Sequence, residues 1–163
     1  MNPTSLYPAD NPFAIQKMDI PRKGCYKIIV PEDYEMVVCE SKKESECLGS
    51  GRLVEIKGRR QPSGELFWIP QKPQTITYFK DDYKIQITVR FFNSTQLINN
   101  STTTHDLRTM LKPLNLRIDG LIADHTTENG LRKSIEATAQ GLVEPMGLRL
   151  VGEVKIELIE RRS

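Results

Sequence analysis

The last third of the chain constrains the fold more than any other part. Two helical patterns follow each other from about residue 105, with apolar residues every three or four positions along one face. The second pattern ends at Gly147, where a positive backbone angle costs a glycine little, and a strand pattern begins at once with Leu148. A helix that ends on glycine and continues directly as a strand is typical of an α+β packing unit.

Breaks within the helical region are predicted from single residues. Pro113 lacks a backbone donor, so the first helix should kink there or begin afresh. Thr104 is expected to cap a helix that begins at His105, and Thr126 or Thr127 should cap the second. In the final strand, five apolar residues are expected to point inward: Leu148, Leu150, Val154, Ile156 and Leu158.

Strand patterns fill the middle of the chain. From Tyr83 to Phe92, apolar and polar residues alternate with a period of two, which indicates a half-buried strand. Shorter strands are predicted at residues 26–30, 35–39, 53–57, 66–69 and 74–79, and a turn at Pro31 makes the second the returning partner of the first. The order predicts an α+β fold, a mostly antiparallel sheet with two or three helices packed on one side.

The N-terminal region reads differently from the rest. Residues 1–22 are rich in proline and show no periodicity, so we expect an N-terminal tail or arm, either disordered or docked on a sheet. Residues 23–163 are then one α+β domain, which the length of 163 residues allows.

Charge and cysteine content exclude several classes. With 23 basic and 21 acidic residues the net charge is +2, which gives no strong electrostatic case for nucleic acid. The start of the chain lacks the form of a signal peptide, and no apolar run is long enough for a transmembrane helix, so a cytoplasmic location is expected. Three cysteines without a Cys-x-x-Cys pair predict reduced thiols rather than a disulfide framework or metal site: Cys25, Cys39 and Cys47.

No residue pattern in the sequence indicates a catalytic reaction. His105 and His125 lie far in sequence from the cysteines. An enzyme with a catalytic thiol or histidine is therefore the least favoured function, after a structural subunit and a small binding module. Asp81 and Asp82 fit a turn better than a calcium loop, and Gly49 and Gly51 lack the remainder of a phosphate loop. We therefore predict a protein that is not an enzyme and has no catalytic, cofactor-binding or metal-binding residues.

Two groups of residues are candidates for binding. A basic cluster could contact the phosphate of an anionic lipid or nucleic acid, although Glu55 and Glu65 dilute it and a solvated hairpin explains it better: Arg52, Lys57, Arg59 and Arg60. The candidate assembly contacts are Phe67 and Trp68, for which core packing is the alternative, and the outward-facing charges of the last strand: Arg149, Glu153, Lys155 and Glu157.

Four segments in this order resemble a known family. They are residues 29–38 (IVPEDYEMVV), 48–53 (LGSGRL), 80–87 (KDDYKIQI) and 146–156 (MGLRLVGEVKI). The chain from about Tyr26 to residue 160 resembles the stomatin/prohibitin/flotillin (SPFH, or band 7) domain, although Ser50 stands where that family usually has proline.

The resemblance implies a domain that assembles side by side into rings or cages, commonly on membranes. Family members usually also carry an N-terminal membrane segment and a long coiled coil, which this sequence does not show. We therefore expect a structural subunit that associates laterally with itself or with other structural subunits into a ring, shell or tube. Peripheral membrane contact stays open, and the alternative function is a small binding module for anionic lipid or nucleic acid.

Overall fold

The computed structural model describes residues 6–21, 23–40, 46–58, 64–99, 106–125 and 127–159. Its strands are β1 (Gln16–Asp19), β2 (Cys25–Ile29), β3 (Tyr34–Glu40), β4 (Glu46–Leu48), β5 (Leu53–Lys57), β6 (Gly64–Pro70), β7 (Gln74–Lys80), β8 (Tyr83–Phe91), β9 (Leu148–Leu150) and β10 (Lys155–Leu158). Its helices are α1 (Ser94–Asn99), α2 (Leu107–Met110), α3 (Lys112–Asp124) and α4 (Glu128–Val143), followed by the 3-10 turn η2 (Glu144–Met146). The α+β class with antiparallel sheets is confirmed.

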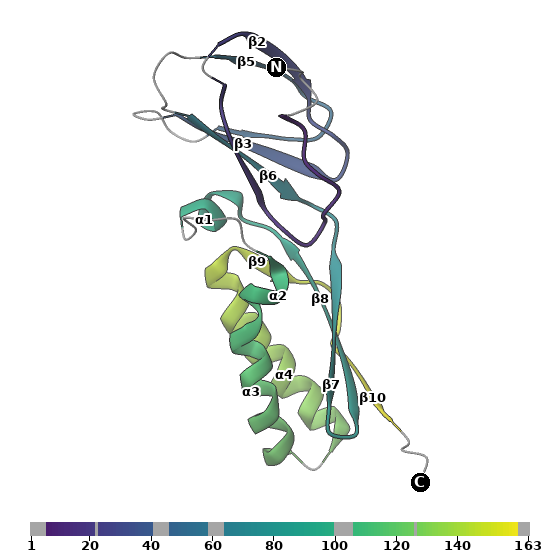
Figure 1. Ribbon diagram of the computed structural model, residues 1–163. Helices are drawn as coiled ribbons and strands as arrows, with labels where there is room; N and C mark the ends of the chain where they lie inside the picture. Colours follow the sequence, from purple (N-terminus) through teal and green to yellow (C-terminus); the bar gives the residue numbers. More distant parts are fainter. Residues whose placement is uncertain are drawn as a thin grey trace.

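The elements form two halves stacked along the long axis of the molecule (Figure 1). The β half contains a four-stranded sheet in the order β1-β6-β3-β4 and a two-stranded ribbon of β2 and β5. The helical half contains a sheet in the order β10-β8-β7, with β9 also paired to β8, and the helices α1 to α4. We use the names β half and helical half for these two regions below.

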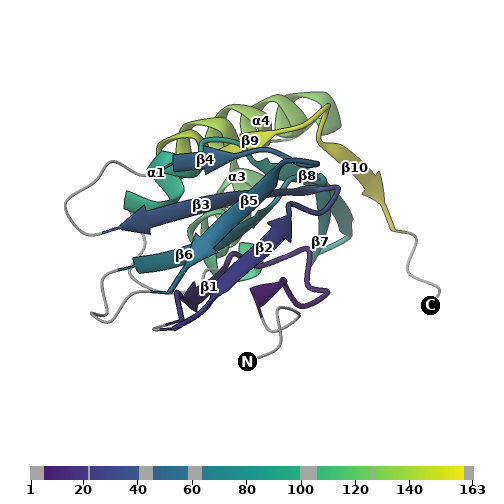
Figure 2. The ribbon, with the colours of Figure 1, turned by 90° about the horizontal axis from the view of Figure 1, so that it is seen from above.

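The sheet of the β half is covered on both faces. On β6, Leu66 and Trp68 pack toward the ribbon, whereas Phe67 and Ile69 pack into the core that the helices share. Every residue from 66 to 70 is buried as a result. A central strand covered on both sides needs a continuous apolar run, which is what this segment has. Figure 2 shows the ribbon of β2 and β5 lying across β3 and β6.

The helical half is covered on one face only. The inward residues of β8 are fully buried against the helices, as the alternation predicted: Ile85, Ile87, Val89 and Phe91. On α4 the buried stripe is Leu131, Ile135, Ala139 and Val143, which confirms the apolar face predicted for this helix. Pro113 lies in the first turn of α3, which confirms a fresh start there, and Thr127 caps α4 by accepting from the Gly130 N–H at 3.1 Å.

Two predictions about the strands were wrong. The strand at 25–29 does not pair with the strand at 34–40: β2 pairs with β5, and β3 pairs with β6 and β4. The turn between them, where Asp33 has a φ of 67°, carries the chain from one sheet to another. The last strand is also not continuous, because it breaks into β9 and β10 around Gly152, whose φ is 69°. The expected cap at Thr104 and helix start at His105 lie outside the described residues, and Asp106 caps α2 instead.

The segment expected to be a tail or arm takes part in the fold from residue 6 onward. Strand β1 pairs with β6, and Leu6 is buried under Trp68, whose Nε1 donates to the Leu6 carbonyl at 2.8 Å. Further along, the Leu107 N–H donates to the Phe13 carbonyl at 2.8 Å. The segment therefore connects the β half to the helical half.

Candidate functional site

The sheet of the helical half has two edge strands without a neighbour among the described residues. Strands β7 and β10 lie on opposite sides of β8, and both run antiparallel to it. The unpaired N–H and C=O groups of such an edge can bind a further strand. Strand β7 spans seven residues, whereas β10 spans four and follows the break at Gly152. The two edges therefore differ in length and regularity.

The pairing also shows which groups of β7 point outward. In an antiparallel ladder, alternate residues of a strand bond to the neighbours on its two sides. The Thr88 carbonyl accepts from Val151 at 2.8 Å, on the β9 side of β8, so Thr88 is not bonded toward β7. Its register partner Thr75, and with it Thr77, therefore direct their backbone groups away from β8.

A groove runs along that outward side of β7. It has a volume of about 560 Å³ and lies between residues 75–78 on one wall and Arg108, Lys112 and Asn115 of α2 and α3 on the other. Asn115 Oδ1 is buried and accepts no hydrogen bond from the described residues. A buried polar atom without a partner costs about 1–3 kcal/mol, so this oxygen marks a place where the fold by itself is incomplete.

Strand β10 presents the opposite edge. Lys155 and Glu157 are exposed on the face of the sheet away from the helices, as expected, and Glu157 lies opposite Lys84 of β8. Leu158 was expected to point inward, but its side chain is 59% exposed because it extends past the packed part of the helices. Glu153 lies before β10 with a carboxylate 3.9 Å from Arg132, a long ion pair between exposed groups.

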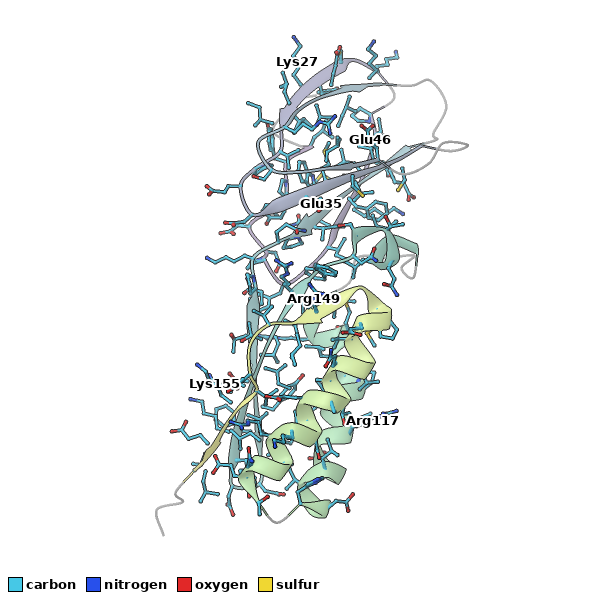
Figure 3. All side chains as sticks on the ribbon, turned by 180° about the vertical axis from the view of Figure 1, so that it is seen from behind. Lys27, Glu35, Glu46, Arg117, Arg149 and Lys155 are labelled. Carbon is cyan, nitrogen blue, oxygen red and sulfur yellow. The ribbon has the colours of Figure 1, made fainter. Side chains whose placement is uncertain are left out.

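Arg149 does not share a strand with those charges. It lies on β9, directly opposite Arg90 of β8, and both guanidinium groups lie over the Phe92 ring, at 3.9 Å and 5.4 Å from its centroid. Within the described part of the chain, no carboxylate forms an ion pair with either arginine. Figure 3 shows Arg149 near the middle of the molecule and Lys155 farther along the helical half. The four charges expected on one strand thus form two separate groups.

The two aromatic candidates lie inside the β half. Trp68 is completely buried and stacks on Tyr7 with ring centroids 6.3 Å apart, and Phe67 is 4% exposed. Both side chains therefore pack in the core, as the alternative prediction had it. Neither is exposed enough in this fold to contact another molecule.

The basic cluster lies partly on the β2–β5 ribbon. Arg52 and Lys57 are exposed at the two ends of β5, while Arg59 and Arg60 lie outside the described residues. The outer face of the ribbon adds Lys27, visible at the far end in Figure 3, and the exposed apolar pair formed by Ile29 and Leu53, which face each other in register. Sequence patterns could not predict this pair, because the alternation of each strand does not say which face a second sheet covers.

The cysteines do not resemble activated nucleophiles. Cys25 Sγ donates to Glu55 Oε1 at 2.9 Å, and this bond raises the pKa of the thiol above its usual value. Burial raises the pKa of Cys47. A catalytic cysteine needs the opposite shift, toward the thiolate.

One histidine forms a pair with a serine. His125 Nδ1 lies 2.9 Å from the Leu121 carbonyl, which can only accept, so in the neutral ring Nδ1 donates there and Nε2, 2.7 Å from Ser134 Oγ, accepts from that hydroxyl. This order of groups is found in hydrolytic sites, but here it ties the end of α3 to α4. Neither residue lines the groove along β7 or the smaller groove between α4 and β10. His105 lies outside the described residues.

No protein-family model matches the chain, and a search of curated proteins found no match. None of the helices in the described ranges combines the length and the apolar character needed to span a bilayer.

Proposed function

We propose that this protein is a non-enzymatic structural subunit that associates laterally, with copies of itself or with other subunits, into a ring, shell or tube. The observation that carries the proposal is the pair of open edges on β7 and β10. Because the edges lie on opposite sides of one sheet, each copy can bind one neighbour at each side. Contacts between two different surfaces close into a ring or continue as a filament.

The distribution of exposed apolar side chains supports this proposal. Phe79 on β7, Leu116 on α3 and Leu158 on β10 are 69%, 75% and 59% exposed. Scattered exposed apolar residues are ordinary, but Phe79 and Leu158 lie on the two edge strands and Leu116 lies on α3, the helix that lines the groove along β7. Burying them in a lateral contact would remove apolar surface from water and stabilise the assembly.

Size measurements test the proposal directly. The purified protein should elute as an oligomer in size-exclusion chromatography with light scattering, and its mass should rise with concentration. Negative-stain images should show rings, tubes or short arcs. A strict monomer at the highest soluble concentration would contradict the proposal.

A second function is favoured by the outer face of the β2–β5 ribbon, namely peripheral binding to an anionic lipid surface. The exposed Ile29 and Leu53 lie near the cations Lys27, Arg52 and Lys57, and Glu55, opposite Lys27 on the same face, offsets part of their charge. Apolar side chains beside cations suit the boundary between lipid headgroups and acyl chains better than they suit nucleic acid.

Vesicle sedimentation tests this second function. The protein should sediment with vesicles that contain phosphatidylserine and not with neutral phosphatidylcholine vesicles, and salt should weaken the binding. A Leu53→Ser variant should bind less, whereas Leu116→Ser, on the distant helix α3, should bind normally. Equal sedimentation of the protein with and without vesicles would exclude this function.

A further inference from the structure

We propose that the groove along β7 is an acceptor site for strand β10 of a second copy of this chain. The inference rests on the proposed function and adds that the two copies in each contact use different surfaces. Strand β7, with α2 and α3, is the acceptor, and β10 is the donor. The association is therefore directional, with two different surfaces in every contact.

The direction of the strands fits this pairing. Strands β7 and β10 are both antiparallel to β8, so they run the same way within one copy. A second copy placed so that the sheet continues brings its β10 alongside β7 in a parallel pair. The outward backbone groups of Thr75 and Thr77 then meet the open side of that β10 strand.

The backbone of β10 has matching free groups. Ile159 donates to the Asp82 carbonyl at 2.6 Å, so the residues of β10 that bond toward β8 alternate with residues that do not. By this alternation, Ile156 and Leu158 direct their N–H groups away from the sheet. These two residues can donate to the β7 edge of a neighbour.

Side chains are complementary as well. Ile156 and Leu158 lie in register with Ile85 and Tyr83, so they point toward the helix side of the sheet. In a neighbour's groove the same side faces α3, where Lys112 and Leu116 are four residues apart on one face. The exposed Leu158 of one copy can thus cover the exposed Leu116 of the next.

Asn115 gives the acceptor site its polar contact. Its Oδ1 is buried and receives no hydrogen bond from the residues that the structure describes, although Asn115 lines the groove. A rotation of the amide turns this oxygen toward an added strand, where the outward N–H of Ile156 or Leu158 can donate to it in place of a β7 carbonyl. The partner would thereby satisfy a group that the isolated chain leaves unsatisfied.

A symmetric pairing of two β7 strands explains less. It would use the groove in both copies, but it would leave the β10 edge and the exposed Leu158 uncovered. It would also stop at a dimer, since a contact between two identical surfaces closes on itself. Donor–acceptor pairing uses both edges of every copy.

The first experiment replaces Asn115 with leucine, which has a similar shape and no polar atom. Removing an unsatisfied buried oxygen should raise the melting temperature of the diluted monomer by about 2–4 °C. The same change should weaken self-association about tenfold, because the contact made in the assembly is lost.

Ser94 supplies a matched control for this experiment. Its Oγ is also buried without a hydrogen-bond partner among the described residues, but Ser94 lies on α1 and does not line the groove. Ser94→Ala should therefore leave the association constant unchanged. If Asn115→Leu lowers the stability of the monomer, or leaves association as strong as in the wild type, the role of Asn115 in the acceptor site is refuted.

The second experiment mixes two variants, each with one edge blocked by proline. Thr77→Pro removes an outward donor from β7, and Leu158→Pro removes one from β10, without deleting a bond to β8. Each variant alone should be monomeric by light scattering, because it lacks one of the two surfaces. An equimolar mixture should form a one-to-one dimer and nothing larger.

The possible results separate this inference from the proposed function. If the wild type assembles but the two folded variants remain monomeric when mixed, donor–acceptor pairing is wrong while lateral association stands. Assembly of either variant by itself would also show that donor–acceptor pairing is wrong. A wild type that never assembles refutes both. Circular dichroism melts of each variant verify that it is folded.

Discussion

The two halves of the molecule differ in how the rest of the chain covers their strands. In the β half, the central strand β6 has a partner on each edge and a core on each face. In the helical half, β8 has partners on both edges, but β7 and β10 each have one open side among the described residues, and only one face of the sheet is covered. Strands β1 and β4 and both strands of the ribbon also have an open side among the described residues. What distinguishes the helical half is the groove beside its open edge β7, with the buried Asn115 Oδ1 that accepts no hydrogen bond from the described residues.

The largest expected effect comes from one aromatic truncation made in each half. Trp68→Ala removes a fully buried ring in the β half and should lower the free energy of unfolding by about 3–5 kcal/mol. Phe79→Ala removes an aromatic ring that is 69% exposed on β7. This change should alter the free energy of unfolding of the monomer by no more than about 0.5 kcal/mol. Urea denaturation of both variants at low concentration measures the difference. Equal losses would show that the Phe79 ring is packed, contrary to the described fold.

A smaller effect is expected at two glycines of the helical half. Both have a positive φ, which costs an alanine about 1–2 kcal/mol. A Cβ at Gly147 would lie 2.7 Å from Leu97 Cγ and 2.9 Å from the Asn93 carbonyl, whereas a Cβ at Gly152 would meet no atom within 4 Å. Gly147→Ala should therefore cost about 3 kcal/mol in total, and Gly152→Ala only the conformational part.

Thermal or chemical denaturation distinguishes the two glycine variants. The turn at Gly147 connects α4 to β9 inside the packed core, and the break at Gly152 separates β9 from β10 at the open edge. Identical losses at both positions would mean that the backbone angle alone sets the cost, and that Leu97 and Asn93 make room for a Cβ at Gly147 without a penalty.

The smallest expected effect concerns the outer face of the β half. Glu55→Gln removes the carboxylate that accepts the hydrogen bond of the Cys25 thiol, so the pKa of Cys25 should fall. Alkylation of Cys25 by iodoacetamide at about pH 8 should then become a few times faster. The bond stabilises the protonated thiol, so its contribution is present below the ordinary thiol pKa and is lost as the pH rises through the raised value.

Peptide mapping of the alkylated protein provides the control. Burial is the main cause of the raised pKa of Cys47, so the alkylation rate of Cys47 should not change in the Glu55→Gln variant. An unchanged rate at Cys25 would show that the hydrogen bond to Glu55 does not form in solution.

Much of the fold could be predicted from local patterns. The alternation around Ile85 and Ile87, the restart of the helix at Pro113, the cap at Thr127 and the turn at Gly147 each depend on a few neighbouring residues, and each is confirmed. The pairing of β2 with β5 could not be predicted, because strand partners are chosen by contacts across the whole chain. The short turn at Asp33 favoured the nearer and wrong partner.

The candidate site was only partly accessible to sequence reasoning. Lys155 and Glu157 were identified from their alternation on the last strand, which strand geometry alone determines. Asn115 gave no signal of its own, since a polar residue beside Leu114 on an amphipathic helix is expected to be solvated. Its burial depends on β7, a strand more than thirty residues away in sequence.

The sequence by itself determined most of the segments of this protein that become helix or strand and which residues of each segment are apolar, because these depend on interactions between close neighbours along the chain. The exceptions are β1, which lies inside the expected tail, and the break of the last strand at Gly152. Only the tertiary structure decided which strands lie at an edge, which faces stay uncovered and which polar atom lacks a partner. Those features depend on the mutual placement of distant segments. No local pattern encodes that placement.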